Sequence, residues 1–331
     1  MSRTTIPHTS PTAAPGPRRA RGAALTALAC AAALTLTACQ GAEAESSTKA
    51  ARAVPPASDP EAPMPSSWPT EVPSSPGPAA SAPATTPAPP AGAAGVPTGA
   101  GVLTGRTVLL DAGHNPGNVK HTSQINRQVD IGNARKECDT TGTSTDAGYS
   151  EAAYSLDVSR RARGILTARG AKVLFTQDDD RDWGPCIDER ARIGNESKAD
   201  AAVSVHGDGA PAARSGFHVI MPARVKAGKA DTTAIVEPSR RLGTLLRDQF
   251  KAATDEPYAD YIGEQGLDTR NDLGGLNLSK VPKVFIECGN MRNEGDARRM
   301  SDPQWRQRAA QGIADAVTAF LTTPGGGATK S

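Results

Sequence analysis

The order of apolar and polar residues divides the chain near residue 101. Nearly all compact apolar runs lie after that point, and each of them is short. Short runs that are rich in Val, Ile, Leu and Phe are typical of buried strands. They predict strands at 106–111, 171–176, 201–205, 216–221 and 283–287.

Helical patterns lie between these runs. In 151–168 apolar residues recur every three or four positions, Ser150 is a suitable N-cap, and Gly170 suits the C-terminal stop. Further helices are expected at 187–197, 237–253 and 304–321. Short strands that alternate with helices predict an α/β fold, a single domain with a mostly parallel twisted sheet of about six strands flanked by helices on both faces.

Two polar stretches interrupt this pattern. Residues 115–149 are rich in Gly and Thr and are expected to form a long loop with room for a hairpin. Long loops within compact domains are usually functional or disordered. Residues 266–278 contain three glycines and look like a loop at the edge of a cleft.

The N-terminus has the pattern of a bacterial export signal. Three arginines precede the uncharged, Ala- and Leu-rich stretch 22–37, which is too short for a comfortable membrane span but suits a signal sequence. The stretch ends in Leu-Thr-Ala-Cys39, which resembles the lipobox of lipoproteins. That resemblance implies a signal peptide over 1–39 and a lipid on Cys39. The alternative is an ordinary secretory signal that is cut further along and removes Cys39.

The segments on either side of the apolar region are expected to be unstructured. Pro, Ala and Ser dominate residues 40–101, which bury too little surface to offset their ordering entropy and should form a disordered linker. Residues 323–331 are expected to be a disordered tail, which leaves one globular domain over 102–322. The protein is expected outside the cytoplasm, in the cell-wall space, either lipid-anchored to the outer face of the membrane or secreted.

Charge excludes some classes of partner. The 37 basic and 35 acidic residues leave a net charge of +2. This balance predicts no nucleic-acid partner and no basic membrane-binding patch beyond the extreme N-terminus. Membrane contact is therefore expected only through the lipid anchor, and the protein is expected to be a monomer.

Candidate metal ligands lie at the ends of the expected strands. His114, His206 and Glu287 each follow an apolar run, and ligands of parallel sheets bind beyond these strand ends. Glu151, at a helix start, is a fourth candidate. Catalytic zinc typically takes three ligands drawn from His and carboxylate and keeps an open position for water. His114, Glu151 and His206 supply such a set, and Glu287 is suited to accept and donate protons.

Each of these residues alone also has a structural explanation. A single histidine at a strand end is more often structural than a ligand, and a glutamate at a helix start is usually present for the helix dipole. Glu287 is harder to explain in this way, because a carboxylate after three apolar residues is costly to bury without a partner. Asp111 either orients a histidine or caps the turn.

Four motifs together resemble one enzyme family. They are Asp111-Ala-Gly-His114, Glu151 before a helix, Ser204-Val-His206 and Glu287-Cys-Gly-Asn290. The combination is similar to the zinc-dependent N-acetylmuramoyl-L-alanine amidases of the amidase-3 type, in particular their secreted actinobacterial members. The resemblance implies one Zn2+ bound by His114, Glu151 and His206, with Glu287 as the catalytic carboxylate. It also implies cleavage of the amide between N-acetylmuramic acid and L-alanine in peptidoglycan or muropeptides.

The resemblance also bears on the cysteines. It implies a disulfide between Cys138 and Cys186 with Cys288 free. From the residues alone, a pairing with Cys288 or three reduced cysteines stay open. The chain departs from the family at Asn115-Pro116, where glycines are more usual. Two other functions also stay open: a zinc peptidase acting within the stem peptide, and a non-catalytic wall-binding lipoprotein.

Overall fold

The computed structural model describes residues 95–323. The expected signal sequence, Cys39, the linker as far as residue 94 and the tail from residue 324 lie outside the described residues. Within the described part, no helix has the length and apolar character needed to cross a membrane.

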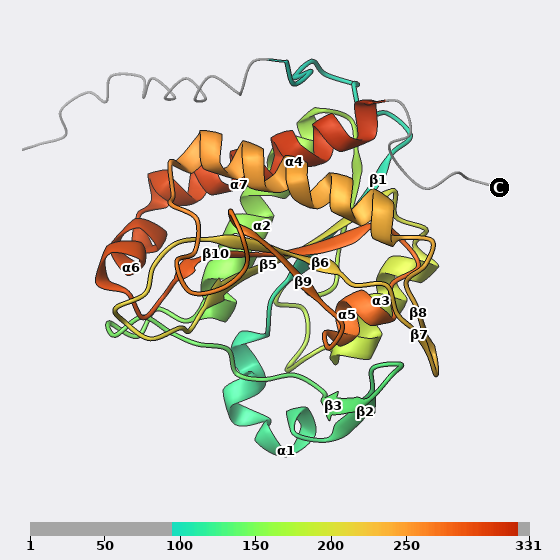
Figure 1. The fold of residues 1–331 in the computed structure, drawn as a ribbon. Helices are drawn as coiled ribbons and strands as arrows, with labels where there is room; N and C mark the ends of the chain where they lie inside the picture. The colour runs from blue at the N-terminus through green and yellow to red at the C-terminus, as the bar shows by residue number, and fades with distance from the viewer. Residues whose placement is uncertain (1–94, 324–331) are drawn as a thin grey trace, which may run out of the picture. The chain divides into compact units, whose positions relative to one another are not determined.

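A six-stranded sheet forms the centre of the domain (Figure 1). In spatial order its strands are β4 (Lys172–Phe175), β1 (Thr107–Ala112), β5 (Ala201–Asp208), β10 (Lys283–Asn290), β6 (His218–Pro222) and β9 (Leu267–Arg270). The first four are parallel to one another, β6 is antiparallel to β10, and β9 is parallel to β6. The expected mostly parallel sheet of six strands is therefore confirmed.

Helices cover both faces of this sheet. One face carries α2 (Glu151–Ala168), α4 (Val236–Thr254) and α7 (Pro303–Thr322), which share one hydrophobic core. The opposite face carries α3 (Ile187–Glu196) and the short α5 (Gly274–Asn277). Figure 1 shows α4 and α7 on one side of the sheet and α3 and α5 on the other. A further helix, α6 (Glu294–Ser301), follows β10.

The long polar segment after β1 lies on the side of α3 and α5, below the sheet in Figure 1. It contains η1 (Pro116–Lys120), α1 (Thr122–Ile125) and a hairpin of β2 (Gln128–Asp130) and β3 (Arg135–Glu137). The disulfide Cys138–Cys186 joins the end of this hairpin to the start of α3. A second small hairpin, β7 (Lys226–Ala227) with β8 (Ala230–Asp231), precedes α4.

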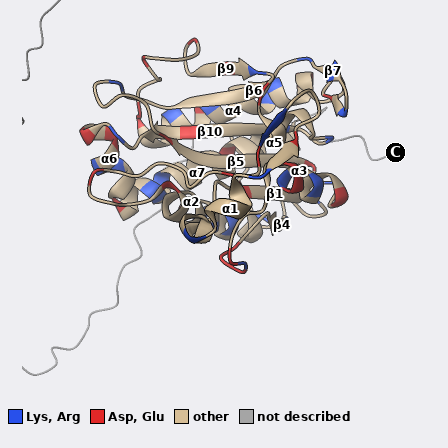
Figure 2. Ribbon diagram, turned by 90° about the horizontal axis from the view of Figure 1, so that it is seen from below, with Lys and Arg blue, Asp and Glu red and all other residues tan. Residues whose placement is uncertain are grey.

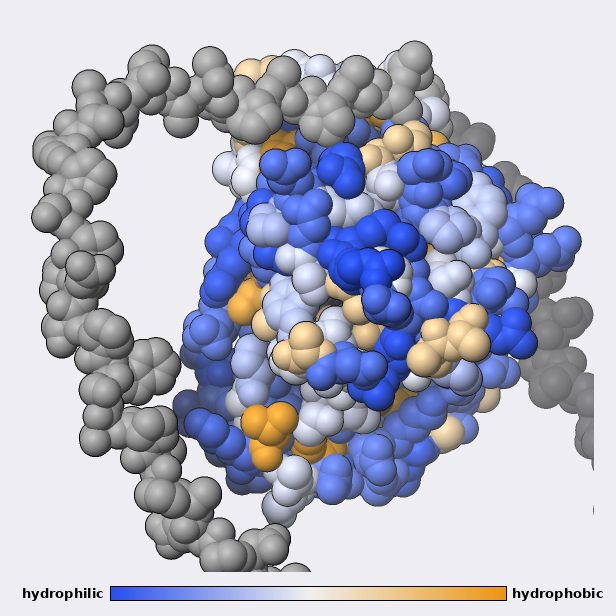
Figure 3. Space-filling model, turned by 90° about the vertical axis from the view of Figure 1, so that its left-hand side faces the viewer, coloured by the Kyte–Doolittle hydropathy of each residue, from blue (hydrophilic) through white to orange (hydrophobic). Residues whose placement is uncertain are grey.

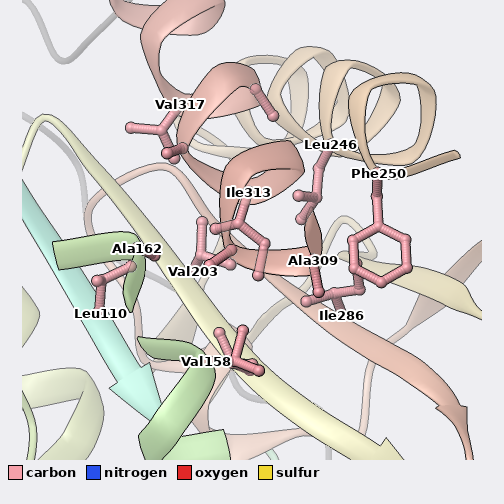
Figure 4. Packing of buried hydrophobic residues seen from close by; sticks show 14 of the residues in the cluster. Leu110, Val158, Ala162, Val203, Leu246, Phe250, Ile286, Ala309, Ile313 and Val317 are labelled. Carbon is pink, nitrogen blue, oxygen red and sulfur yellow. The ribbon is translucent and has the colours of Figure 1, made fainter. Parts of the chain in front are cut away.

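Alternation along the strands decides which side chains enter the core. Leu110, Val203 and Ile286 point from β1, β5 and β10 toward the helices (Figure 4). Their partners in this core include Val158 and Ala162 of α2, Leu246 and Phe250 of α4, and Ala309, Ile313 and Val317 of α7. Full burial of one Val, Leu or Ile side chain stabilises the folded state by about 1.5–3 kcal/mol relative to leaving it exposed. Because successive side chains point to opposite faces of a sheet, Asp111, Ser204 and Glu287 face away from this core.

The outer surface is polar and mixed in charge. The face seen in Figure 3 is largely hydrophilic, with apolar residues scattered over it. Basic and acidic residues are interspersed around α3 and α6 in Figure 2. The apolar residues are therefore concentrated in the interior. The sheet face that carries Asp111, Ser204 and Glu287 is an exception, and we call it the polar face.

Local signals predicted the helices more accurately than the strand ends. The helix expected at 151–168 has these bounds in the structure, because Ser150 Oγ accepts a hydrogen bond from the Ala153 amide. However, β5 continues to Asp208 and β10 to Asn290, since these strands pair with each other beyond the apolar residues. Glu287 therefore lies inside a strand and not at its end. The stretch 266–278, expected as a loop, contains β9 and α5.

Candidate metal centre

Two histidines and one glutamate meet on the polar face of the sheet. His114 follows β1, Glu151 begins α2, and His206 lies on β5. Oε1 of Glu151 is 3.1 Å from Nε2 of His114 and 2.8 Å from Nδ1 of His206. One donor atom from each residue lies within 4.8 Å of the other two. The structure thus brings together all three ligand candidates, in an arrangement that a single metal ion could bridge.

A tight turn presents His114. Its backbone is left-handed, with φ of 59°, a region that residues other than glycine rarely adopt. The preceding Gly113 is required by space, because a Cβ there would lie 2.5 Å from the ring of His206. The main-chain oxygen of His114 accepts hydrogen bonds from Arg190 at 3.0 Å and Gln177 at 3.1 Å. These bonds hold the turn that aims the ring.

Glu151 is fixed at the first position of α2. Its Oε2 accepts a hydrogen bond from the Thr143 amide at 2.9 Å, which leaves Oε1 facing the two histidines. Burial alone would raise the pKa of Glu151, but the charge of His114 and the hydrogen bonds from His114 and His206 lower it. The helix N-terminus also favours a negative charge. The carboxylate is therefore kept ionised, as metal ligation requires.

The pocket favours a cation. Burial alone would lower the pKa of His114, but the charge of Glu151 and the hydrogen bonds to Asp139 and Glu151 raise it to about 10. The surroundings thus stabilise a positive charge beside Glu151. A metal ion can supply that charge in place of a proton, so this donor set fits a divalent cation.

Glu287 lies on β10, level with His206 of β5 and His218 of β6. Its carboxyl group is buried, and Oε2 has no hydrogen-bond partner among residues 95–323. Burial raises the pKa of Glu287 well above its usual value, and the charges of Glu151 and Asp208 add to the increase. A buried carboxyl group with a raised pKa next to a set of metal ligands is a candidate general acid–base.

A cleft of about 850 Å³ contains these residues. Its walls come from the polar face of the sheet, the β2–β3 hairpin and the segment from β9 to α5. Phe285 of the sheet stacks on the His206 ring, with centroids 5.1 Å apart. At the rim, Asp272 pairs with Lys136 and Arg270, each at 2.8 Å. A concave site of this size, in which titratable side chains converge, is a candidate ligand-binding site.

Sequence reasoning missed a buried ionic network behind the histidines. Asp111 pairs with Arg190 at 2.9 Å and with Lys283 at 2.7 Å. Arg190 also pairs with Asp139, which lies 3.1 Å from Nδ1 of His114. Asp111 reaches His206 through Ser204, whose Oγ lies 3.0 Å from Oδ2 of Asp111 and 3.1 Å from Nε2 of His206. A lysine at the start of an apolar strand was the available signal for Lys283, whereas Asp139 lies in a polar loop that carries no such signal.

Two features of the sequence act on the loop after β1. They are the cysteines and Asn115, which stands where the resembling family more often has glycine. Cys138 and Cys186 form the disulfide, and Cys288 is free and buried. Asn115 is 1% exposed and does not line the cleft. Its side chain accepts a hydrogen bond from the Gly117 amide and donates one to the Gly184 oxygen. Asn115 thus stabilises the loop after β1 without lining the cleft.

The fold and the site together define a class of protein: an α/β domain with three potential metal ligands on one face of its sheet, beside a buried carboxyl group. Comparison with known proteins gives the family. Residues 108–319 match the family model Amidase_3, described as N-acetylmuramoyl-L-alanine amidase. An N-acetylmuramoyl-L-alanine amidase of Mycobacterium tuberculosis is 38% identical over 228 residues, which cover 67% of this chain and 89% of that protein.

Two solved structures are similar as well. The N-acetylmuramyl-L-alanine amidase Ami1 of Mycobacterium smegmatis is 39% identical, with a TM-score of 0.62 over 66% of this chain and 98% of that one. Ami1 of Mycobacterium abscessus is 42% identical, with a TM-score of 0.61 over 66% and 99%. The chain belongs to the Amidase_3 family of N-acetylmuramoyl-L-alanine amidases. The family resemblance found in the sequence is thereby confirmed, including its actinobacterial character.

Proposed function

We propose that the chain hydrolyses the amide bond between N-acetylmuramic acid and L-alanine of peptidoglycan, with one Zn2+ held by His114, Glu151 and His206. The observation that carries the proposal is the proximity of these three donors in a cleft that also contains the carboxyl group of Glu287. Membership of the amidase family supports the choice of bond.

The donor set supports zinc in particular. Two imidazoles and one carboxylate are typical of catalytic zinc sites, which keep a fourth position open. Metal-binding histidines almost always use their other ring nitrogen in a hydrogen bond. Nδ1 of His114 has Asp139 as its partner, and Nε2 of His206 has Ser204. A bound zinc ion would lower the pKa of a water molecule in its open position and polarise the scissile carbonyl group.

Glu287 carries the proton. It accepts a proton from the attacking water molecule and returns it to the L-alanine nitrogen as the carbon–nitrogen bond breaks. Burial raises the pKa of Glu287, which makes the protonated form a more available donor at neutral pH than an exposed glutamate would be. The products are a muramic acid carboxylate and a stem peptide with a free N-terminal L-alanine.

The N-terminal segment supports action outside the cytoplasm. The lipobox at Cys39 suits an enzyme anchored to the outer face of the cell membrane. The Pro-rich stretch after it would let the catalytic domain reach the cell wall. In this proposal the protein works as a monomer on peptidoglycan or on muropeptides released from it. The mass of the mature N-terminal peptide tests the anchor, because lipidation of Cys39 adds acyl chains that ordinary secretion does not.

The experiment that tests the function compares the protein with Glu287→Gln on defined muropeptides. The unaltered protein is expected to release intact sugar and a peptide that begins with L-alanine, as identified by mass spectrometry. Glu287→Gln should retain zinc, measured by elemental analysis, but lose turnover. Glu196→Gln, at an exposed position of α3, is the control and should keep both. A fully active Glu287→Gln variant would remove Glu287 from the mechanism.

The same product analysis separates the rival functions. A peptidase acting within the stem peptide would leave L-alanine attached to the sugar and yield shortened peptides. A non-catalytic wall-binding protein would retain muropeptides without changing their mass. Either result would contradict the proposed amidase activity.

A further inference from the structure

Arg190 connects the two histidine ligands through one buried network. Arg190 is 5% exposed and lies on α3, outside the donor set. Nη1 lies 2.9 Å from Oδ1 of Asp111, and Nη2 lies 3.1 Å from Oδ2 of Asp139. One planar fork therefore holds two carboxylates that arrive from separate segments, a geometry that arginine can supply and lysine cannot.

Each of these carboxylates leads to a different histidine. Oδ1 of Asp139 lies 3.1 Å from Nδ1 of His114. Because a carboxylate can only accept, Asp139 holds a proton on Nδ1. Nε2 faces Glu151, where a bound metal ion would replace the proton that the two groups share.

The second path runs through Ser204. Its Oγ donates to Oδ2 of Asp111 at 3.0 Å, so it accepts from Nε2 of His206 at 3.1 Å. This holds a proton of His206 on Nε2 and leaves Nδ1, which faces Glu151, as the nitrogen available to a metal ion. With a metal ion bound, both histidines would have the tautomer that metal binding needs.

Arg190 also holds the chain that carries His114. Nη1 donates to the main-chain oxygen of Ala112 at 2.6 Å, and Nη2 donates to that of His114 at 3.0 Å. Lys283 lies 2.7 Å from Asp111 and is the second cation of the network. The network therefore contains two buried cations and two buried carboxylates, so it can remain charged without a net burial of charge.

We infer that Arg190 is a positioning residue for the metal site, which fixes the tautomer and ring orientation of His114 through Asp139 and of His206 through Asp111 and Ser204. The inference rests on the proposed metal site but not on the substrate. Outer partners of metal-binding histidines typically change metal affinity by about 10- to 100-fold when they are altered. A single residue that serves both histidines should have an effect in that range.

The test measures zinc affinity of the full chain by competition with a chromophoric chelator. Arg190→Lys keeps the positive charge but loses the fork, and we expect its affinity to fall by at least about 10-fold. The absorption spectrum of bound Co2+ should change as well, because it reports ligand geometry. Loss of packing alone would not change that spectrum.

A matched control separates positioning from stability. Arg169 is also buried and pairs with Asp315 at 2.6 Å, in the contact of α2 with α7. Arg169→Lys should lower the unfolding temperature yet bind zinc as the unaltered protein does. If Arg190→Lys binds zinc within about 3-fold of the unaltered protein, or if Arg169→Lys loses as much affinity, the inference is overturned.

A second variant decides the case in which Arg190→Lys does not fold. Asp139→Asn keeps the size of the side chain but replaces the acceptor of His114, and it should lose at least about 10-fold in zinc affinity. Unchanged affinity in Asp139→Asn would overturn the inference. Failure of the unaltered protein to take up zinc would overturn this inference together with the proposed function. Zinc binding without amide cleavage would contradict the proposed function alone.

Discussion

Nζ of Lys283 lies 2.7 Å from Oδ2 of Asp111, and both side chains are 1% exposed. The two residues come from β10 and β1, which β5 separates in the sheet. The ion pair therefore spans a third strand on the same face that carries His206. A buried ion pair is costly to break, because removal of one partner leaves the other charge uncompensated.

Lys283→Met tests the role of this pair in stability. The substitution keeps the approximate length of the side chain but leaves Asp111 with Arg190 as its single remaining cationic partner among residues 95–323. We expect the free energy of unfolding in guanidinium chloride to fall by about 3 kcal/mol or more. Lys280→Met, at an exposed position three residues earlier, should change it by less than about 0.5 kcal/mol. A loss below about 1 kcal/mol in Lys283→Met would mean that the pair contributes no more than a surface contact.

The pH dependence of stability follows from the same carboxylate. Burial alone would raise the pKa of Asp111, but the charges of Lys283 and Arg190 lower it below the ordinary value of 3.8. Below pH 3.8 the unfolded chain binds a proton that the folded chain does not, so the stabilisation by Asp111 is complete above that pH and is lost as pH falls. The maximal slope for one group is about 1.4 kcal/mol per pH unit.

Unfolding free energies of the protein and of Asp111→Asn give the measurement. Their difference should be constant between pH 7 and pH 5 and should shrink below pH 3.8. Comparison with the variant removes the contributions of the other carboxylates, which both proteins share. A difference that stays constant down to pH 2.5 would show that Asp111 titrates alike in the folded and unfolded chains.

Much of the fold could be predicted because its signals are local. The cap at Ser150 and the helical spacing after it lie within a few residues, and α2 has the expected bounds. The ends of β5 and β10 could not be predicted, because their last residues are polar and are held only by pairing across the sheet. The order of the strands is equally non-local, since β10 separates the strand of His206 from that of His218.

The candidate site also contains some residues that have a local signal in the sequence and others that have none. His114 and His206 could be singled out because His206 directly follows an apolar run and His114 follows one after a short turn. Asp139 and Arg190 could not be found in this way. Arg190 is 79 residues from Asp111 and 51 from Asp139, and nothing local indicates that they meet. The candidate metal ligands lie in motifs that can be recognised in the sequence. The residues that support them, such as Asp139 and Arg190, come together only in the completed fold.

Gly113→Ala tests the steric fit of the two histidines. The new Cβ would lie 2.5 Å from Cε1 and Nδ1 of His206 and 2.8 Å from the main-chain oxygen of Val205. Either the ring or the turn must move, so we expect a loss of stability of about 1–3 kcal/mol and a clear loss of zinc affinity.

Gly164→Ala is the matched control for this substitution. Gly164 lies within α2 and has open space at its Cβ position. Alanine there should raise the free energy of unfolding by about 0.5–1 kcal/mol and leave zinc affinity unchanged. Equal zinc affinity in Gly113→Ala and Gly164→Ala would show that the His206 ring can shift without cost to metal binding.

The disulfide should influence the metal site as well as stability. Cys138 directly precedes Asp139, and the main-chain oxygen of Cys138 accepts a hydrogen bond from the Ile187 amide at 2.7 Å. Cys186 accepts through its main-chain oxygen from the amide of Arg190. The bond between Cys138 and Cys186 thus ties together the two segments that provide Asp139 and Arg190.

Replacement of both cysteines by serine should lower the free energy of unfolding by about 4 kcal/mol in the chain-entropy model, since the two positions are 48 residues apart. Zinc affinity should fall too, even at temperatures where the variant is fully folded, because Asp139 and Arg190 are no longer held in register. Chelator competition and chemical unfolding on the same sample separate the two effects. Cys288→Ala is the control, since this cysteine is free and buried in the core on the opposite face of the sheet. If the double serine variant binds zinc as tightly as Cys288→Ala does, the disulfide stabilises the fold without acting on the metal site.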